Sequence, residues 1–499
     1  MKMLFDYHKT KSFDIERNGI QLIENDECIK IYNDPFRTVT LFITEDKSGE
    51  LIIFSDFKDY YDFKSMDRAV DQAGFWEIVL FGSGLWTRTL YKNVKQMPGA
   101  SCLTVYKNSK QYNIERYWNY DIKEDDSIQS IEQAADGMYA ILDDIFASLD
   151  KKECYLLGMS GGMDSRITLA FLSKHIPHKN IKLFTYGFDE NILEYEYAKD
   201  IANSLGIAVP DFHQLTAASY KEALSYLPSL SGGQISINHC HILDYFRKNN
   251  LGDCRHITTY FSDAVFGWDC TYPKKIKEIK NNYYANAVSK YINLTPEIKK
   301  IITDDSLKIF SGFDVEANFS SLDEFKYVTE RNQKFHMLLA SLQGRSIATD
   351  FIYANMALLR YSLSIPIKYR QNKNIIDTLL DKYFKNISSR DFKNISSRFQ
   401  WGSKYSGLFN WHFFRFLNRA NSVLRVATRG RIQLLNKYQT EEHERLLYSK
   451  FRGDLHATTA RFLAMGMLSA EQKIEFDKLP IRSAGVAERY ALISLAKII

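Results

Sequence analysis

The chain has 499 residues, and its 65 lysines and arginines nearly balance its 60 aspartates and glutamates, which gives a formal net charge of +5. Its 45% share of apolar residues and 25% share of charged residues are ordinary for a globular protein. These values exclude a mainly disordered chain, a collagen-like chain and a dedicated nucleic-acid-binding tail. At roughly 100–200 residues per domain, the length allows two to four domains.

The cysteines and the N-terminus indicate the compartment. The six cysteines contain no C-x-x-C spacing, so we expect free thiols in a reducing environment. Charged residues stand where a secretory signal would need its apolar stretch, and no window approaches about 18 consecutive apolar residues. We therefore expect a cytoplasmic protein with no membrane partner.

The first part of the chain predicts β-structure followed by a linker. Residues 38–57 read as two strands joined by a Lys-Ser-Gly turn, and residues 100–118 read as a second such pair. Residues 121–130 are acidic and polar without apolar periodicity, which is typical of a linker. We place the first domain at 1–125 and the second at 130–499.

The second domain predicts alternating helices and strands. Helical spacing of apolar residues alternates with short apolar runs over the ranges 131–149 (helix), 153–159 (strand), 166–176 (helix), 181–188 (strand) and 194–206 (helix). This alternation predicts an α/β domain with a parallel sheet. Helical patterns dominate beyond about residue 275, with a helical extension from about residue 410.

The Ser-Gly-Gly-Met-Asp-Ser stretch at 160–165 lies between a predicted strand and a predicted helix. Gly161 and Gly162 let the backbone approach an anion, and the N–H groups at the helix N-terminus are donors for it. Ser160 and Ser165 add hydroxyl groups, and Asp164 suits Mg²⁺ that bridges phosphate oxygens. The stretch therefore predicts a pyrophosphate-binding loop, distinct from the absent G-x-x-x-x-G-K-[ST] loop. The alternative is a glycine-rich turn without a ligand.

This loop resembles that of the N-type ATP pyrophosphatases, and the residues downstream resemble the asparagine synthetase family. Thr-Tyr-Gly-Phe ends the second strand at 185–188, Glu194 follows it, and Asp263 matches the family's second metal-binding aspartate. Residues 350–366 resemble a family helix, and the segment before residue 118 resembles the end of a glutaminase domain. The resemblance covers roughly residues 40–405.

The resemblance implies a fold class. The chain would be an α/β protein with a β-rich N-terminal remnant of an Ntn-hydrolase, or glutaminase-like, domain. A parallel-sheet, adenine nucleotide α-hydrolase-like synthetase domain with a helical C-terminal part would follow. Glutamine-dependent members carry a nucleophilic Cys at position 2, where this sequence has Lys2. We therefore expect no glutaminase activity, and a structural remnant or a partner surface in its place.

A second departure from the family is Tyr260, where asparagine-forming members have a glutamate. A tyrosine here is similar to β-lactam and carbapenam synthetases, in which a Tyr–Glu pair removes a proton from the attacking amine. The likeness implies that Glu330 is the partner of Tyr260 and that Lys404 neutralises the developing oxyanion. The alternatives are an aromatic ring packed at a strand end and structural roles for Glu330 and Lys404.

The family likeness also implies ATP and Mg²⁺ as cofactors. Metal binding falls to Asp164 and Asp263, although Asp263 is alternatively a helix-capping acid. Two aspartates at the carboxyl ends of parallel strands would face the same crevice. The expected nucleotide-binding residues are Gly158, Ser160, Gly161, Gly162, Asp164, Ser165, Tyr186, Thr258 and Thr259.

The function that follows is an ATP-dependent, AMP-forming amide synthetase, a carbon–nitrogen ligase that joins a small-molecule carboxylate to ammonia or an amine. One interpretation is asparagine synthesis that uses ammonia or a separate glutaminase. Another is a specialised ligase for a secondary metabolite, a peptide or a polysaccharide, and a third is an inactive nucleotide-binding protein. The basic stretch 411–450 is interpreted as a solvated helix face rather than a tRNA contact. His239 and His241 lack a distal ligand pair, so no metal is expected there. Loops between about 208 and 245 should line the substrate pocket.

Overall fold

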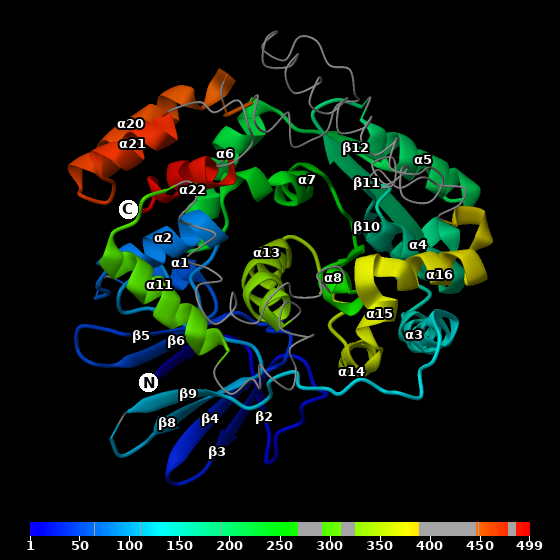
Figure 1. Ribbon diagram of the computed structural model, residues 1–499, viewed down its shortest axis with the longest axis horizontal. Coiled ribbons are helices and arrows are strands. Elements are labelled where there is room, and N and C mark those ends of the chain that lie inside the picture. The colour runs from blue at the N-terminus through cyan, green and yellow to red at the C-terminus, as the bar shows by residue number, and fades with distance from the viewer. Residues whose placement is uncertain are drawn as a thin grey trace.

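The computed structural model of the chain describes residues 1–63, 65–109, 111–190, 192–267, 292–310, 325–388, 446–447, 449–477 and 486–499. The N-terminal sheets lie at one end of the molecule and the parallel sheet at another, with helix α13 (Met337–Gln343) between them (Figure 1). Within the described ranges, no helix combines the length and the apolar character that a membrane crossing requires.

Two sheets form the N-terminal region. The first has the order β1 (Lys2–Leu4), β6 (Leu51–Phe54), β5 (Leu41–Glu45) and β7 (Lys95–Met97). The second has the order β2 (His8–Lys9), β3 (Ile20–Glu24), β4 (Cys28–Asn33), β8 (Ser101–Tyr106) and β9 (Tyr112–Arg116). The antiparallel pairs β5–β6 and β8–β9 confirm the two predicted hairpins.

The first sheet is a central layer that is buried on both faces. One face packs against the second sheet, where Ile43 and Ile53 join the same apolar cluster as Ile31 and Leu103. The opposite face lies under helices α1 (Phe57–Asp62) and α2 (Gln72–Phe81). Burial on both faces explains why β5 and β6 are apolar without strict alternation.

The third sheet, which lies in the predicted α/β region, is fully parallel, as predicted. Its order is β12 (Asp211–Gln214), β11 (Ile181–Gly187), β10 (Tyr155–Gly158), β13 (Arg255–Ile257) and β14 (Thr349–Asp350). The chain leaves β10 toward β11 on one side and reaches β13 on the other. The carboxyl end of β10 is therefore a topological switch point, where ligands bind in open α/β sheets.

Helices cover both faces of the parallel sheet. The helices α3 (Ile131–Ala147), α4 (Met163–His175) and α16 (Asn374–Tyr383) pack together beside it (Figure 1). On the other face, Tyr245 and Phe246 of α7 (His241–Lys248) pack on Leu156 and Phe184 of the strands. Helix α5 (Leu193–Ser204) follows β11. These strands and helices confirm the predicted α/β alternation.

The rest of the described chain is mostly helical. It contains η1 (His178–Asn180), α6 (Ala217–Leu230), η2 (Ile237–His239), α8 (Ser262–Val265), α11 (Pro296–Ile309), η4 (Tyr327–His336), α14 (Met356–Ser364), α15 (Ile367–Arg370), η5 (Gln371–Lys373), η6 (Lys385–Ile387), α20 (Arg452–Ala464), α21 (Ala470–Asp477) and α22 (Val486–Leu495). Most of the 208–245 segment, expected as loops, is thus β12, α6, η2 and the start of α7.

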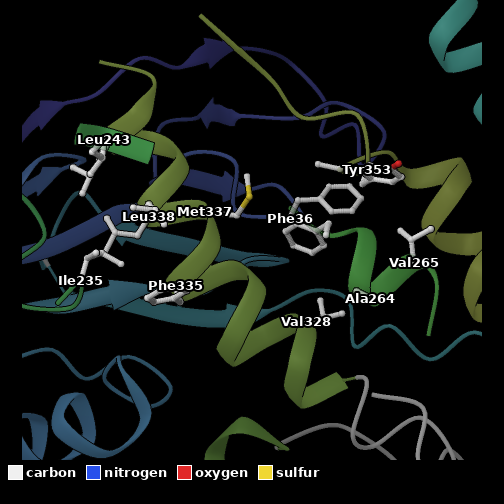
Figure 2. Close-up of a cluster of buried hydrophobic side chains, with 14 of the residues drawn as sticks. Phe36, Ile235, Leu243, Ala264, Val265, Val328, Phe335, Met337, Leu338 and Tyr353 are labelled. Carbon is white, nitrogen blue, oxygen red and sulfur yellow. The ribbon is translucent and has the colours of Figure 1, made fainter. Parts of the chain in front are cut away.

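The N-terminal region contributes to the core beside the parallel sheet. Phe36 belongs to the same buried cluster as Tyr353 and Val265 (Figure 2), and its ring contacts Phe261 at a centroid distance of 5.2 Å. Between the two regions, the backbone N–H of Asp125 donates to the carbonyl of Ser364 at 2.7 Å. The predicted linker is therefore held against the second region, whereas the domain boundary and the Ntn-hydrolase origin of the N-terminal region stay predictions.

The expectation of free thiols is wrong for one pair of cysteines. Cys154 and Cys254 form a disulfide with their Cα atoms 4.4 Å apart. They are 100 residues apart in sequence but directly precede the neighbouring strands β10 and β13. The sequence could not show this pairing, because the strand order brings the two residues together. Cys28, Cys102 and Cys240 are free thiols.

Candidate functional site

A cavity of about 410 Å³ lies at the carboxyl ends of β10, β11 and β13. The structure brings most of the predicted nucleotide-binding residues to it. Those that line it are Gly158, Ser160, Gly162, Asp164, Ser165, Tyr186, Thr258 and Thr259, together with Tyr260.

The glycine loop depends on Gly161 for its shape. Gly161 has a φ of +67°, and a Cβ atom on it would lie 2.5 Å from Cβ of Tyr197. Gly162 caps α4 without a side-chain hydrogen bond, so no capping side chain occupies the N–H groups of the first turn. This geometry suits an anion at the helix N-terminus.

Arg166 supports the glycine loop through a hydrogen bond to its backbone, a role that was not predicted from the sequence. Its guanidinium is buried, and Nη2 donates to the carbonyl oxygen of Gly161 at 2.9 Å. Burial lowers the pKa of Arg166 to about 10, so the group keeps its positive charge at neutral pH. The positive charge of Arg166 next to the glycine loop favours the binding of an anion at the loop.

Two aspartates and a lysine meet beside the loop. Nζ of Lys373 lies 2.5 Å from Oδ2 of Asp164 and also forms an ion pair with Oδ1 of Asp263. Tyr327 donates its hydroxyl proton to Oδ2 of Asp263 at 2.9 Å. The three charged groups come from α4, α8 and the residue before α16, so the fold assembles the cluster from distant parts of the chain.

The charges of the cluster act on one another. Burial raises the pKa of Asp164 and outweighs the opposing effect of Lys373. Burial also acts to raise the pKa of Asp263, but Lys373 outweighs it and holds that pKa below its usual value. For Lys373, the two carboxylates outweigh burial and raise the pKa, so the lysine is charged at neutral pH.

The aspartate pair fits a divalent cation. Oδ1 of Asp164 is buried and has no hydrogen-bond partner within the described parts of the chain. Magnesium on a triphosphate takes one or two protein carboxylates, with water and phosphate oxygens as its other ligands. Asp164 and Asp263 could therefore hold Mg²⁺. The described residues contain no group of three or more His, Cys, Asp or Glu side chains placed to hold a metal by themselves.

Backbone strain accompanies the cluster. Lys373 and Phe261 are non-glycine residues with φ of 57° and 73°, in the left-handed region. Lys373 precedes α16, and Phe261 lies between Tyr260 and α8. Such conformations are uncommon in non-glycine residues and concentrate at functional sites.

Tyr260 does not meet the expected glutamate. Its hydroxyl oxygen accepts a hydrogen bond from Nε2 of Gln343 at 2.9 Å. Its ring stacks on His336, with centroids 5.0 Å apart and planes 11° apart. The side chains beside Tyr260 are thus an amide and an imidazole.

Glu330 lies away from the cavity. Its carboxylate pairs with Nζ of Lys334 at 2.6 Å, and Lys334 also donates to the carbonyl of Gly84 in the N-terminal region at 2.9 Å. The structure therefore places Glu330 in a buried ion pair rather than beside Tyr260. The other predicted catalytic residue, Lys404, falls outside the described residues.

Several residues of the cavity were not predicted from the sequence. Arg331, His336, His239 and His241 line it, although the two latter were considered only as metal ligands. A signal did exist for Lys373, because a basic residue directly before a helix opposes the helix dipole. The residues on η4 had no such signal, because it is a π-helix and its spacing differs from the α-helical period.

These features define a parallel α/β protein whose glycine loop and Asp164 line one cavity at a switch point, while Lys373 joins Asp164 to Asp263. The family model described as asparagine synthase matches residues 149–251. This segment, which contains the glycine loop, is therefore similar to the asparagine synthase family of ATP-dependent, amide-forming ligases. None of the curated proteins compared matches the chain.

Proposed function

We propose that the protein is an AMP-forming amide synthetase that activates a carboxylate with ATP and transfers it to ammonia or an amine. The observation that carries this proposal is the shared cavity of the glycine loop and Asp164, with Lys373 joining Asp164 to Asp263. A site for triphosphate cleavage needs both a phosphate cradle and a means of balancing the released charge.

In the first step, a substrate carboxylate oxygen attacks the α-phosphorus of ATP, and pyrophosphate leaves toward the loop at 160–165. Backbone N–H groups at the start of α4 and the hydroxyls of Ser160 and Ser165 bind the pyrophosphate. Mg²⁺ on Asp164 and Asp263 would offset the charge on the phosphate oxygens. Lys373 holds the two aspartates together and supplies a charged donor beside them.

In the second step, ammonia or an amine attacks the acyl carbon of the mixed anhydride, and AMP leaves. Holding both reactants in one cavity supplies much of the acceleration in such a reaction. Gln343 beside Tyr260 provides no support for the Tyr–Glu base of the β-lactam synthetase likeness. The carboxylate and the amine are small molecules.

The test is product analysis with ATP labelled at the α-phosphate. The purified full chain is incubated with Mg²⁺, ammonium and pools of amino acids, dicarboxylates or hydroxy acids, and AMP is separated from ADP. We expect AMP and pyrophosphate in equal amounts from at least one pool, and ADP as the main product would contradict the proposal.

The matched variant is Asp164→Asn, which keeps the shape of the side chain and removes the charge needed for Mg²⁺. Asp136→Asn serves as the control, because Asp136 pairs with Lys382 on an exposed surface. We expect Asp164→Asn to abolish AMP formation and Asp136→Asn to retain it. A near-normal rate in Asp164→Asn would exclude the assigned role of the loop.

A further inference from the structure

The second step of the proposed function leaves one proton without an acceptor, and the following inference rests on that function. When the amine nitrogen bonds to the acyl carbon, the bond from that carbon to the phosphate oxygen breaks. AMP leaves with the electron pair of the broken bond. One N–H proton of the attacking nitrogen must pass to a base within hydrogen-bond reach.

Two acidic groups of the cavity are already engaged by other side chains. Tyr260 has an amide partner, Gln343, instead of a carboxylate. Asp164 is bound to Lys373. Glu194 also lines the cavity, and its backbone carbonyl oxygen is 3.6 Å from the position that a Cβ on Gly161 would take.

The histidines of the cavity differ in what surrounds them. His241 stacks on Tyr186, with centroids 4.4 Å apart, and His239 packs against Phe335 at 4.5 Å. His336 alone among the histidines that line the described cavity stacks on Tyr260. Its imidazole therefore lies beside Tyr260 in the cavity that the glycine loop lines.

A hydrogen bond fixes the tautomer of His336. Its Nδ1 lies 2.7 Å from Oδ1 of Asn332, one turn earlier on η4. An amide oxygen only accepts hydrogen bonds, so Nδ1 of a neutral imidazole carries the proton and Nε2 keeps its lone pair. Asn332 is fully buried, so solvent does not compete for its amide.

We propose that Nε2 of His336 accepts the proton of the attacking amine when the amide bond forms. Tyr260 holds one face of the imidazole, Asn332 fixes its tautomer, and the ring lines the same cavity as the glycine loop. His336 is thus a catalytic residue of the amine-capture step, whereas Asn332 is a positioning residue.

The surrounding charges determine when His336 can accept a proton. Burial, together with a smaller effect of Arg331 on η4, lowers its pKa to about 3, although Asp263 on α8 acts in the opposite direction. The imidazole is therefore neutral in the empty cavity at neutral pH. Pyrophosphate and the AMP phosphate bring negative charge to the cavity, and nearby negative charge raises the pKa of a base. Proton acceptance is thus coupled to the presence of the reaction's anions.

The first test is nitrogen NMR of the full chain with ¹⁵N-labelled histidine, with the His336 signals identified by their loss in His336→Gln. We expect a neutral Nδ1–H tautomer at pH 7, and a shift toward the doubly protonated form when Mg²⁺, AMP and pyrophosphate are added together. His239→Gln is the control and should leave these signals unchanged. A neutral Nε2–H tautomer, or no shift with the products bound, would overturn the proposal.

The second test separates the two steps with a carboxylate that gives AMP in the product analysis. His336→Gln should keep ATP–pyrophosphate exchange within about threefold, and should slow amide formation by about 100-fold, the lower range for loss of a general base. Equal loss of both rates would mean that His336 only shapes the cavity. Calorimetry with MgATP distinguishes failure of the proposed function from failure of the role of His336. If the wild-type chain does not bind MgATP, both proposals are wrong. If it binds MgATP and His336→Gln forms the amide at an unaltered rate, only the role of His336 is wrong.

Discussion

At the scale of single residues, the ion-pair cluster around Lys373 determines the properties of the candidate site. Lys373 has a side chain only 5% exposed and contacts both aspartates. A buried charge is costly unless it is paired. The cluster is therefore a joint unit, in which removal of one member leaves the others uncompensated.

Lys373→Met tests this coupling. Removal of one partner from a buried charge pair typically costs about 3–5 kcal/mol, so we expect a loss of that order in the free energy of unfolding together with loss of AMP formation. The second variant, Lys373→Met with Asp263→Asn, should recover part of the stability, because one unpaired carboxylate is gone. Chemical denaturation measures both values.

Lys382→Met is the matched control for this experiment. Lys382 pairs with Asp136 at 2.5 Å, and both side chains are more than 40% exposed. An exposed pair contributes about 0–1 kcal/mol. An equal loss in Lys373→Met and Lys382→Met would contradict the importance of the cluster.

The individual site residues were predictable to different degrees. The loop at 160–165 was predictable because the residues that form it are consecutive in the sequence. Tyr260 was found by resemblance, but its partner Gln343 was not, since the pairing depends on how α13 lies against the loop after β13. Lys373 carried only a weak local signal, and its two contacts are visible only in the folded chain.

At the scale of elements, the strands and helices of the parallel region follow directly from apolar periodicity. The predicted helix at 166–176 is α4, which begins three residues earlier because the loop glycines lead directly into its first turn. The π-helix η4 could not be predicted, because its identity depends on tertiary contacts on both sides. The disulfide between β10 and β13 likewise depends on strand order.

Gly161→Ala tests the loop as an element. The added methyl would meet a left-handed φ and a contact of 2.5 Å with Tyr197, so we expect loss of MgATP binding by calorimetry. Gly206→Ala is a matched control with the same φ of +67° and no atom within 4 Å of the added carbon. If both variants bind MgATP equally well, the close approach at Gly161 is unimportant.

The buried His256 on β13 should make the free energy of unfolding depend on pH. Burial lowers its pKa from 6.5 to about 3, so the folded chain binds fewer protons than the unfolded chain between these values. Stability is therefore full above about pH 6.5 and declines as the pH falls, by about 1.4 kcal/mol per unit at most.

His256→Leu should remove this contribution. Between pH 7.5 and pH 5, we expect the wild-type chain to lose about 2 kcal/mol more stability than the variant, as measured by urea unfolding at both values. Parallel declines in the two proteins would show that His256 is not the titrating group.

At the scale of the whole molecule, the N-terminal region is joined to the candidate site through η4. Gln333 on η4 donates from Nε2 to the carbonyl of Pro35 at 2.7 Å, and its Oε1 accepts from the N–H of Gly99 at 3.1 Å. Arg37 donates to the carbonyl of Gln333 at 3.2 Å. The composition and the hairpin patterns predicted two regions, but these contacts are more than 200 residues apart in sequence and were not predictable.

Gln333→Ala tests the contact between the regions. It leaves the buried N–H of Gly99 without its partner and removes one of two donors to the carbonyl of Pro35, which still accepts from the hydroxyl of Tyr120. We therefore expect a loss of about 1–3 kcal/mol in the free energy of unfolding. Gln214→Ala, at an exposed position, should change stability by no more than about 0.5 kcal/mol. If Gln333→Ala also loses no more than about 0.5 kcal/mol, contacts other than those of Gln333 hold the two regions together.

The most direct test of the central claim is a crystal structure of the full chain with Mg²⁺ and an ATP analogue that resists cleavage between its α- and β-phosphates. We predict that the β- and γ-phosphates lie against residues 160–165, that the metal contacts Asp164 and Asp263, and that the adenine lies near Gly158 and Tyr186. An analogue bound outside this cavity, or with its phosphates turned away from the glycine loop, would contradict the proposed function.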